Sequence, residues 1–396
     1  MQTVLAVHNF YQHAGGEDEV YRGETELLAG HGHSVIRYEE DNARVHGGWA
    51  TGFGATWNLV SYRRLRAAAR TYRPDVAHIY NTFPLISPSA YYALKKQGVP
   101  IVQKLGNFRL LCPGANLVRD GKVCEQCIEH RSFLPAISHR CYRSSLPATA
   151  AVSAMLTVHR VMGTWQKLVD VFVAHTEFAR RKFIEGGLPA DRIAVTPHMI
   201  SPDPGVGEGR GGYALFVGRL SEEKGVRTLV KAWQKLPEIP LLVAGDGPLG
   251  HMPWPRGVTW LGELPHPRVL ELMKNAHLLV VPSVCYEIGP LTILEAFACG
   301  VPVIASDLGS MAERVEHGVN GLLFRPGDAD DLVRQVHWAF GHPEQWTTMR
   351  AEARREFERK YTAERSYRHL MDIYEMAKGN ARGVQREAAV AVASAS

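Results

Sequence analysis

The sequence lacks any apolar run of about 18 residues, the minimum for a helix that crosses a membrane. Its first residues, MQTVLAVHNF, have neither the basic segment nor the small-residue cleavage site of a secretory signal. A strong excess of one charge is also missing, since the formal net charge is only +5. We therefore expect a cytoplasmic protein, with no nucleic-acid partner.

Length and composition indicate two globular domains. The 396 residues exceed one ordinary domain of about 150 residues more than twofold. Hydrophobic residues make up 45% of the chain and charged residues 21%, which is typical of a protein with a large buried core. Disorder over most of the chain is therefore not expected.

Short apolar strands alternate with helical stretches in two series. The first series contains TVLAVHN, VAHIYN, IVQKL and VDVFVAHT, and the second contains YALFVGRL, PLLVAG, LLVVPS and PVIAS. Such alternation is typical of parallel strands joined by crossover helices. We predict an α/β fold with two doubly wound, Rossmann-like domains that face a central cleft. Ligands are then expected at the carboxyl ends of the strands and between the domains.

A Pro- and Gly-rich stretch, TPHMISPDPGVGEGRGG, separates the two series and is the best candidate for a linker. The predicted parts are an N-terminal domain over 1–195 with a cysteine-rich insert at 112–141, a linker over 196–212, a C-terminal domain over 213–355, a helix over 356–378 that crosses back to the N-terminal domain, and a flexible tail over 379–396.

Positive charge is concentrated in the first half of the chain. Residues 1–200 contain 23 Lys and Arg against 16 Asp and Glu. Part of this excess is the stretch YRRLRAAARTYR at 62–73, whose five arginines could meet anionic lipid or phosphate. A solvated helix face is the favoured interpretation, and peripheral membrane contact is the alternative.

The stretch EIGPLTILEAFACG places two glutamates, Glu287 and Glu295, eight positions apart around the segment 289–292. A proline in this segment fits the first turn of a helix, whose free N–H groups would suit a phosphate. Glu295 lies in an apolar context, where it could accept hydrogen bonds from vicinal hydroxyls such as those of a ribose. Glu287 could do the same for a sugar ring. Compensation of the helix dipole is the simpler alternative, and we favour function.

A second stretch, FVGRLSEEKGVRTLV, predicts a phosphate clamp. A strand ends at Gly218, and Arg219 and Lys224 flank the turn that follows. A guanidinium and an ammonium at the carboxyl end of a strand can bind a diphosphate, although surface cations are common. Near the N-terminus, Gly15 and Gly16 precede a predicted helix and allow either backbone approach to a ligand or a plain turn.

These stretches together support a resemblance to a known family. FVGRLSEEKG, AGDGPL, EIGPLTILEAFACGVPVIASD and HGVNGLLF resemble the retaining family 4 glycosyltransferases of the GT-B fold, in a register that covers roughly residues 1–375. The segments GGEDEVYRGETELLAGHGHSV, NTFPLISPSA and NFRLLCP look like the subgroup found in bacterial polysaccharide and glycoconjugate assembly.

The resemblance implies transfer of a sugar, with retention, from a nucleotide-diphosphate sugar to the hydroxyl of a sugar, lipid-linked or small-molecule acceptor. The departing phosphate oxygen would help to deprotonate the acceptor, so neither a protein nucleophile nor a catalytic metal is expected. By resemblance, the catalytic residues are Arg219 and Lys224, on the diphosphate, and Glu287, on the donor sugar. The residues implied to bind the donor are Gly15, Gly16, Gly218, Gly289, Pro290, Leu291, Thr292 and, on the ribose, Glu295.

One position departs from the family pattern. Many relatives have a histidine before Asn-Phe-Arg, whereas this chain has Gly106. His8 and His175 could partly substitute for it, although a lone histidine is more often structural. The absence leaves two alternatives to a transferase: a nucleotide-sugar epimerase on the same scaffold, and a non-catalytic protein that binds sugar nucleotides. An anionic or lipid-linked acceptor would place the protein at the inner face of the membrane.

Four of the six cysteines fall within one segment, as C-x11-C-x2-C-x13-C. In a cytoplasmic chain, Cys112, Cys124, Cys127 and Cys141 suggest a structural zinc site of four thiolates, with His139 as a spare ligand. Free buried thiols are the equally weighted alternative, because the segment contains only one C-x-x-C.

Overall fold

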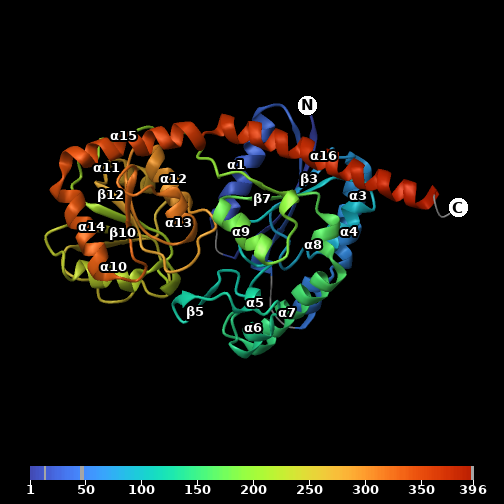
Figure 1. Ribbon diagram of the computed structural model, residues 1–396, viewed down its shortest axis with the longest axis horizontal. Coiled ribbons are helices and arrows are strands. Elements are labelled where there is room, and N and C mark those ends of the chain that lie inside the picture. Colours follow the sequence, from blue (N-terminus) through green and yellow to red (C-terminus); the bar gives the residue numbers. More distant parts are fainter. Residues whose placement is uncertain (13–14, 45–48, 394–396) are drawn as a thin grey trace.

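The protein has two α/β lobes, each built on a six-stranded sheet in which all paired strands are parallel. The computed structural model describes residues 1–12, 15–44 and 49–393. Figure 1 shows the lobes side by side, with two successive helices along one side of the molecule: α15 (Pro343–Lys360) on the second lobe and α16 (Ala363–Ala393) on the first. The predicted α/β class with two doubly wound domains is confirmed.

The first sheet has the order β2-β1-β3-β4-β7-β8 and the second the order β11-β10-β9-β12-β13-β14. The first sheet comprises β1 (Thr3–Phe10), β2 (Ser34–Asp41), β3 (Val76–Ile79), β4 (Ile101–Lys104), β7 (Val171–Ala174) and β8 (Ile193–Val195). The second comprises β9 (Ala214–Val217), β10 (Leu241–Ala244), β11 (Val258–Gly262), β12 (Leu278–Val281), β13 (Val303–Ser306) and β14 (Gly321–Phe324).

The central strands are short and apolar because both faces of each sheet are covered by helices. All four residues of β7, VFVA, and all four of β12, LLVV, are buried. In the first lobe the helices are α1 (Gly16–Gly30), η1 (Asn42–Arg44), α2 (Trp49–Thr56), α3 (Leu59–Tyr72), α4 (Ser89–Lys95), α5 (Gln126–Glu129), α6 (Leu134–Ser138), α7 (Leu146–Met162), α8 (Thr164–Leu168), α9 (Glu177–Glu185) and η2 (Ala190–Arg192). In the second they are η3 (Glu222–Lys224), α10 (Val226–Trp233), α11 (His266–Asn275), α12 (Leu291–Ala298), α13 (Gly309–Arg314), α14 (Ala329–Gly341) and α15 (Pro343–Lys360).

Each sheet has a point where the order of its strands reverses, between β1 and β3 in the first lobe and between β9 and β12 in the second. Connections leave such a pair of strands in opposite directions, so a crevice opens at their carboxyl ends, where doubly wound proteins bind ligands. The loops that follow β1, β9 and β12 are those that the sequence marked as candidate binding segments.

The long helix α16 (Ala363–Ala393) follows α15 of the second lobe and lies along the first lobe. It leaves the second lobe and packs on the first, where Ile373, Tyr374 and Ala377 are buried against the strands. A hydrogen bond of 2.9 Å joins the Tyr374 hydroxyl to Nδ1 of His78. The residues 379–393, which the sequence assigned to a tail, continue this helix. Within the described ranges, no helix combines the length and apolarity needed to span a bilayer.

Polar contacts also hold the lobes together near the crevices. Glu313 of the second lobe accepts hydrogen bonds from the backbone N–H groups of Glu177, at 2.8 Å, and Phe178, at 2.6 Å. It therefore supplies negative charge to the start of α9 in the first lobe, where the helix dipole favours it. Next to it, the hydroxyls of Thr176 and Ser310 are 2.9 Å apart.

Candidate active site

The start of α12 has the free backbone donors that the sequence predicted. The helix begins at Leu291 with Pro290 as its N-cap, so Pro290 lies just before the first turn and not within it. The first N–H groups of a helix, here including those of Leu291 and Thr292, have no acceptor inside it. Gly289 leaves no room for a side chain, since a Cβ atom there would lie 3.0 Å from Cδ2 of His198.

An ion pair ties the segment before this helix to the loop after β9. Nζ of Lys224 lies 2.7 Å from Oε1 of Glu287, and the Ser283 hydroxyl donates to the same oxygen at 2.7 Å. Burial alone would raise the pKa of Glu287, but the Lys224 charge and these hydrogen bonds bring it below its ordinary value. Burial lowers the pKa of Lys224, but Glu287 and the neighbouring groups raise it by more, so the net shift is upward. Both groups therefore stay charged at neutral pH.

The loop after β9 also presents the second predicted cation. Gly218 follows the strand, and the Arg219 side chain is exposed, with no ion-pair partner among the described residues. Gly225 closes the turn with φ of 72°, and a Cβ atom there would lie 1.8 Å from the carbonyl oxygen of Pro282. Only glycine permits this contact, which packs the loop against the end of β12.

Glu295 lies inside α12 and is 9% exposed, as its apolar context predicted. Its Oε1 accepts a hydrogen bond from Nε2 of His266, the first residue of α11, at 2.7 Å. This hydrogen bond to the carboxylate raises the pKa of His266 above its ordinary value, although partial burial lowers it. Nothing in the sequence pointed to His266 as a partner of Glu295, because 29 residues separate the two.

The glycines after β1 face the start of α12 from the other lobe. Gly15 is the N-cap of α1, and its N–H donates to Oδ2 of Asp18 at 3.2 Å. A Cβ atom at Gly16 would lie 3.2 Å from Cδ1 of Leu291. The structure thus brings together the predicted residues of both lobes, at the two crevices.

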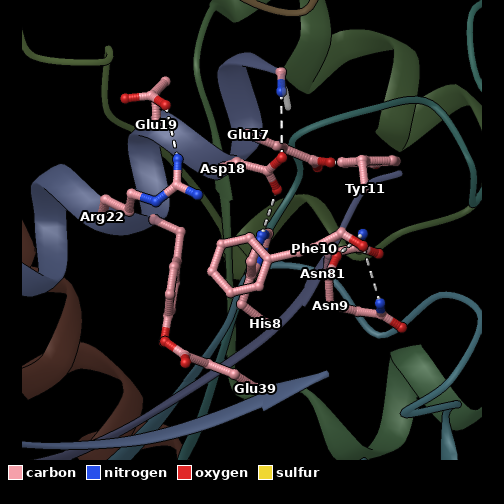
Figure 2. Close-up of polar contacts among 12 residues, drawn as sticks. His8, Asn9, Phe10, Tyr11, Glu17, Asp18, Glu19, Arg22, Glu39 and Asn81 are labelled. Carbon is pink, nitrogen blue, oxygen red and sulfur yellow. Dashed lines mark hydrogen bonds and ion pairs between the residues drawn. The ribbon is translucent and has the colours of Figure 1, made fainter. Parts of the chain in front are cut away.

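The two histidines considered as substitutes have structural partners. His8 is fully buried and its Nε2 donates to Oδ1 of Asp18 at 2.7 Å, as Figure 2 shows. His175 donates from Nδ1 to the carbonyl oxygen of Thr196 at 3.0 Å and stacks on His198, with ring centroids 3.6 Å apart. Burial holds the pKa of His175 well below its ordinary value, so it is neutral at pH 7.

Sequence reasoning did not identify Glu17, whose side chain occupies the space beside Gly106. Its carboxylate accepts hydrogen bonds from the Tyr11 hydroxyl and from Nδ2 of Asn107. The only signal was indirect: a small residue stands where many relatives have a side chain. The partner of that position could not be read from the sequence.

The cysteine-rich insert contains a small hairpin of β5 (Val118–Arg119) and β6 (Lys122–Val123), followed by α5 and α6. Burial, followed by the nearby thiols of Cys112, Cys141 and Cys124, raises the pKa of Cys127 to about 12. The four thiols are therefore neighbours. Among the described residues, however, no group of three or more His, Cys, Asp or Glu side chains is arranged to hold a metal ion. The zinc site stays a prediction without support from this geometry.

Two family models match the chain, one in each lobe. The model described as Glycosyl transferase 4-like domain matches residues 20–198. The model described as Glycosyl transferases group 1 matches residues 207–356. The chain belongs to the family 4 glycosyltransferases.

Curated relatives of this glycosyltransferase match over part of their length. An uncharacterized glycosyltransferase of Methanocaldococcus jannaschii is 35% identical over 130 residues, which are 30% of this chain and 33% of that protein. O-antigen chain mannosyltransferase B of Escherichia coli is 33% identical over 144 residues, 32% of this chain and 36% of that protein. The matched segments thus span about a third of these curated relatives.

Solved structures match the glycosyltransferase over almost its whole length. HepE of Anabaena, in complex with UDP-glucose, has a TM-score of 0.67 at 17% identity, covering 94% of this chain and 99% of that one. Sucrose-phosphate synthase of Thermosynechococcus elongatus has a TM-score of 0.70 at 17% identity, covering 95% and 98%. The likeness shows that this chain has the GT-B fold.

The contact between Glu295 and His266 predicts a pH-dependent effect. Because the carboxylate raises the pKa of His266, Glu295→Gln should lower that pKa toward the usual histidine value of about 6.5. The pair of His266 and Glu295 stabilises the fold fully when the pH lies below the unfolded-state histidine pKa of about 6.5. It loses that contribution as the pH rises through the folded-state pKa of His266. NMR titration of His266 checks the shift, with His251 as an exposed control. An unchanged His266 pKa would contradict the pairing.

The four cysteines predict a metal content that can be measured. If their thiolates coordinate zinc, protein purified without a metal-affinity resin should contain about one zinc per chain. Cys127→Ser should lose the metal, whereas Cys299→Ser, a buried cysteine of the other lobe, should keep it. Elemental analysis together with circular dichroism tests both, and a folded, metal-free wild type would refute the site.

Proposed function

We propose that the protein is a retaining glycosyltransferase that moves a sugar from a nucleotide-diphosphate sugar to an acceptor hydroxyl in polysaccharide or glycoconjugate biosynthesis. One observation carries the proposal. Arg219 and Lys224 follow β9, and the free N–H groups at the start of α12 follow β12, so all of them lie at the carboxyl ends of the two strands between which the strand order of the second sheet reverses. This is a diphosphate-binding arrangement of charge and backbone donors.

Each group has a distinct part in this proposal. The exposed Arg219 guanidinium would bind the diphosphate as a fork, and Lys224, fixed by Glu287, would add a point charge. Glu287 would also accept a hydrogen bond from the donor sugar. Within the described residues, His266 binds only Oε1 of Glu295, so Oε2 would accept hydrogen bonds from the ribose.

The acceptor would approach from the first lobe, past Gly15 and Gly16. Its hydroxyl oxygen would bond to the anomeric carbon on the face that the phosphate leaves, which retains the configuration. The departing phosphate oxygen would take the hydroxyl proton. The protein's residues would then orient the reactants and stabilise the developing phosphate charge, with no covalent intermediate on the chain.

Donor binding is the first test. UDP is the first probe because HepE, which shares the fold, was solved with UDP-glucose, and GDP, ADP and TDP complete the panel. Arg219→Ala and Glu295→Ala should each weaken binding of the best nucleotide diphosphate by about 1–3 kcal/mol, or roughly 5- to 150-fold. Isothermal calorimetry measures the change.

The matched control is Arg256→Ala. Arg256 is also exposed, but it precedes β11 and lies at the opposite, amino edge of the second sheet. The Arg256→Ala variant should bind the nucleotide diphosphate with the affinity of the wild type. Unchanged affinity in both site variants would place the donor elsewhere, and no binding of any nucleotide would contradict the proposed function.

We also propose that the first lobe touches the cytoplasmic face of an anionic membrane. A hydrogen bond of 2.9 Å from Nε2 of His159 to the carbonyl oxygen of Thr56 joins the ends of α7 and α2. Exposed apolar side chains surround this junction and form the α2–α7 patch: Trp57, Leu59, Val60, Val158, Val161 and Met162. Exposed Arg63 and Lys167 lie one turn further along α3 and on α8. Apolar side chains with neighbouring cations suit an anionic lipid surface.

Vesicles test this surface. The protein should sediment with phosphatidylcholine vesicles that contain phosphatidylglycerol at low salt, and less with neutral vesicles. Val161→Asp should reduce the bound fraction severalfold, because it places a negative charge in the patch. Val206→Asp, at an exposed valine outside the first lobe, is the control. Equal binding by the Val161 variant, or no sedimentation of the wild type, would contradict the proposal.

A further inference from the structure

Glu17 points from the start of α1 into the first lobe, as Figure 2 shows. The Tyr11 hydroxyl donates to its Oε2, and Nδ2 of Asn107 lies 3.1 Å from Oε1 and 3.3 Å from Oε2. The carboxylate is thus held from two loops, one after β1 and one after β4. In the same view, Asp18 turns the other way, toward His8.

The position of the carboxylate depends on a missing side chain. A Cβ atom at Gly106 would lie 2.0 Å from Oε1 of Glu17 and 2.6 Å from its Cγ, distances that real Cβ atoms do not adopt. Glu17 in this conformation and a side chain at 106 therefore exclude each other, so a side chain there would require Glu17 to move. In this chain the space at the end of β4 belongs to Glu17.

Glu17 also lines a cavity of about 50 Å³ at the carboxyl ends of β3 and β4. The cavity has space for several water-sized groups. Its lining is mixed: polar residues, Tyr80, Asn81, Thr82, Tyr91, Gln103, Lys104, Asn107 and Arg109, alternate with apolar ones such as Phe83, Leu105, Leu110 and Trp165. Gln103 already bonds to Tyr91 and Lys104 to Glu24, which leaves Glu17 and its neighbours at the cavity to meet a hydroxyl group.

The environment of Glu17 is fixed by residues of its own lobe. Burial, with a smaller contribution from Asp18, raises the pKa of its carboxyl above the ordinary value, although the Tyr11 hydroxyl, the His8 ring and Asn107 act to lower it. The diphosphate-binding groups proposed above belong to the other lobe. Glu17 and its cavity therefore lie on the acceptor side, one residue from the contact between Gly16 and Leu291.

We propose that Glu17 contacts the acceptor: its carboxylate accepts a hydrogen bond from the attacking hydroxyl and aligns it with the donor sugar. The inference rests on the proposed function. The acceptor oxygen bonds to the anomeric carbon, the bond from that carbon to the phosphate oxygen breaks, and the proton passes to that oxygen. Glu17 orients the hydroxyl and keeps no proton. When water replaces the acceptor, Glu17 orients the water in the same way.

Donor hydrolysis tests the role without knowledge of the natural acceptor. The substrate is the best-binding glucose donor among UDP-, GDP-, ADP- and TDP-glucose, and release of the nucleotide diphosphate is measured. Glu17→Gln keeps the shape of the side chain but loses the charge, so the rate should fall at least 10-fold with melting temperature and nucleotide affinity unchanged. Glu26→Gln, an exposed glutamate of the same helix, should match the wild type.

A second variant displaces Glu17 without altering it. Gly106→Ala must push the carboxylate away, so hydrolysis should again fall about 10-fold while nucleotide binding persists. Gly30→Ala, whose Cβ would meet nothing within 4 Å, is the matched glycine control. A wild-type rate in Glu17→Gln or Gly106→Ala would overturn the role of Glu17. So would a wild type that binds nucleotide but hydrolyses no donor, whereas a wild type that binds no nucleotide would overturn the proposed function itself.

Discussion

The ion pair between Lys224 and Glu287 is the interaction on which the second lobe's site depends. It spans the point where β9 and β12 send their connections in opposite directions, so it joins two loops that no sheet hydrogen bond connects. Taking two charges out of water is costly, and here the mutual attraction and the Ser283 hydroxyl offset that cost. The pair therefore helps to hold the cation loop against the segment before α12, together with a hydrogen bond of 2.9 Å from the Val284 N–H to the Glu223 carbonyl oxygen.

The site needs a second constraint, because its two halves belong to different lobes. Glu313 of the second lobe binds the start of α9 in the first lobe. The helix α16, which follows α15 of the second lobe, is attached to the first lobe by the hydrogen bond between Tyr374 and His78. These contacts set the approach of Gly16 to Leu291. In the proposed function, a donor bound by the second lobe would then face groups of the first.

The sequence predicted the fold correctly and selected residues of the second lobe that the structure places on neighbouring loops, for a physical reason. Arg219, Lys224, Glu287 and Glu295 all follow strands of one sheet within short loops or the next helix, so local pattern and strand order suffice to place them together. Contacts between distant segments had no such signal. Asn107 and Glu17 are 90 positions apart, and the cysteine insert has no periodicity from which a side-chain arrangement could be derived. The helical continuation of α16 was missed because GNARG reads as a break.

The contrast between the lobes has a consequence for how such an enzyme changes specificity. The residues proposed to bind the diphosphate lie on backbone turns whose glycines and helix start admit few alternatives, as the contact of Gly225 with Pro282 shows. The groups around Glu17 and its cavity are side chains from the loops after β1, β3 and β4. Because position 106 is glycine, Glu17 can fill the space beside it. A larger side chain at 106 would displace Glu17 and so move a negative charge within the cavity proposed to bind the acceptor, while the strands stay unaltered. The acceptor side can therefore change by single substitutions, while the donor side is held by the backbone.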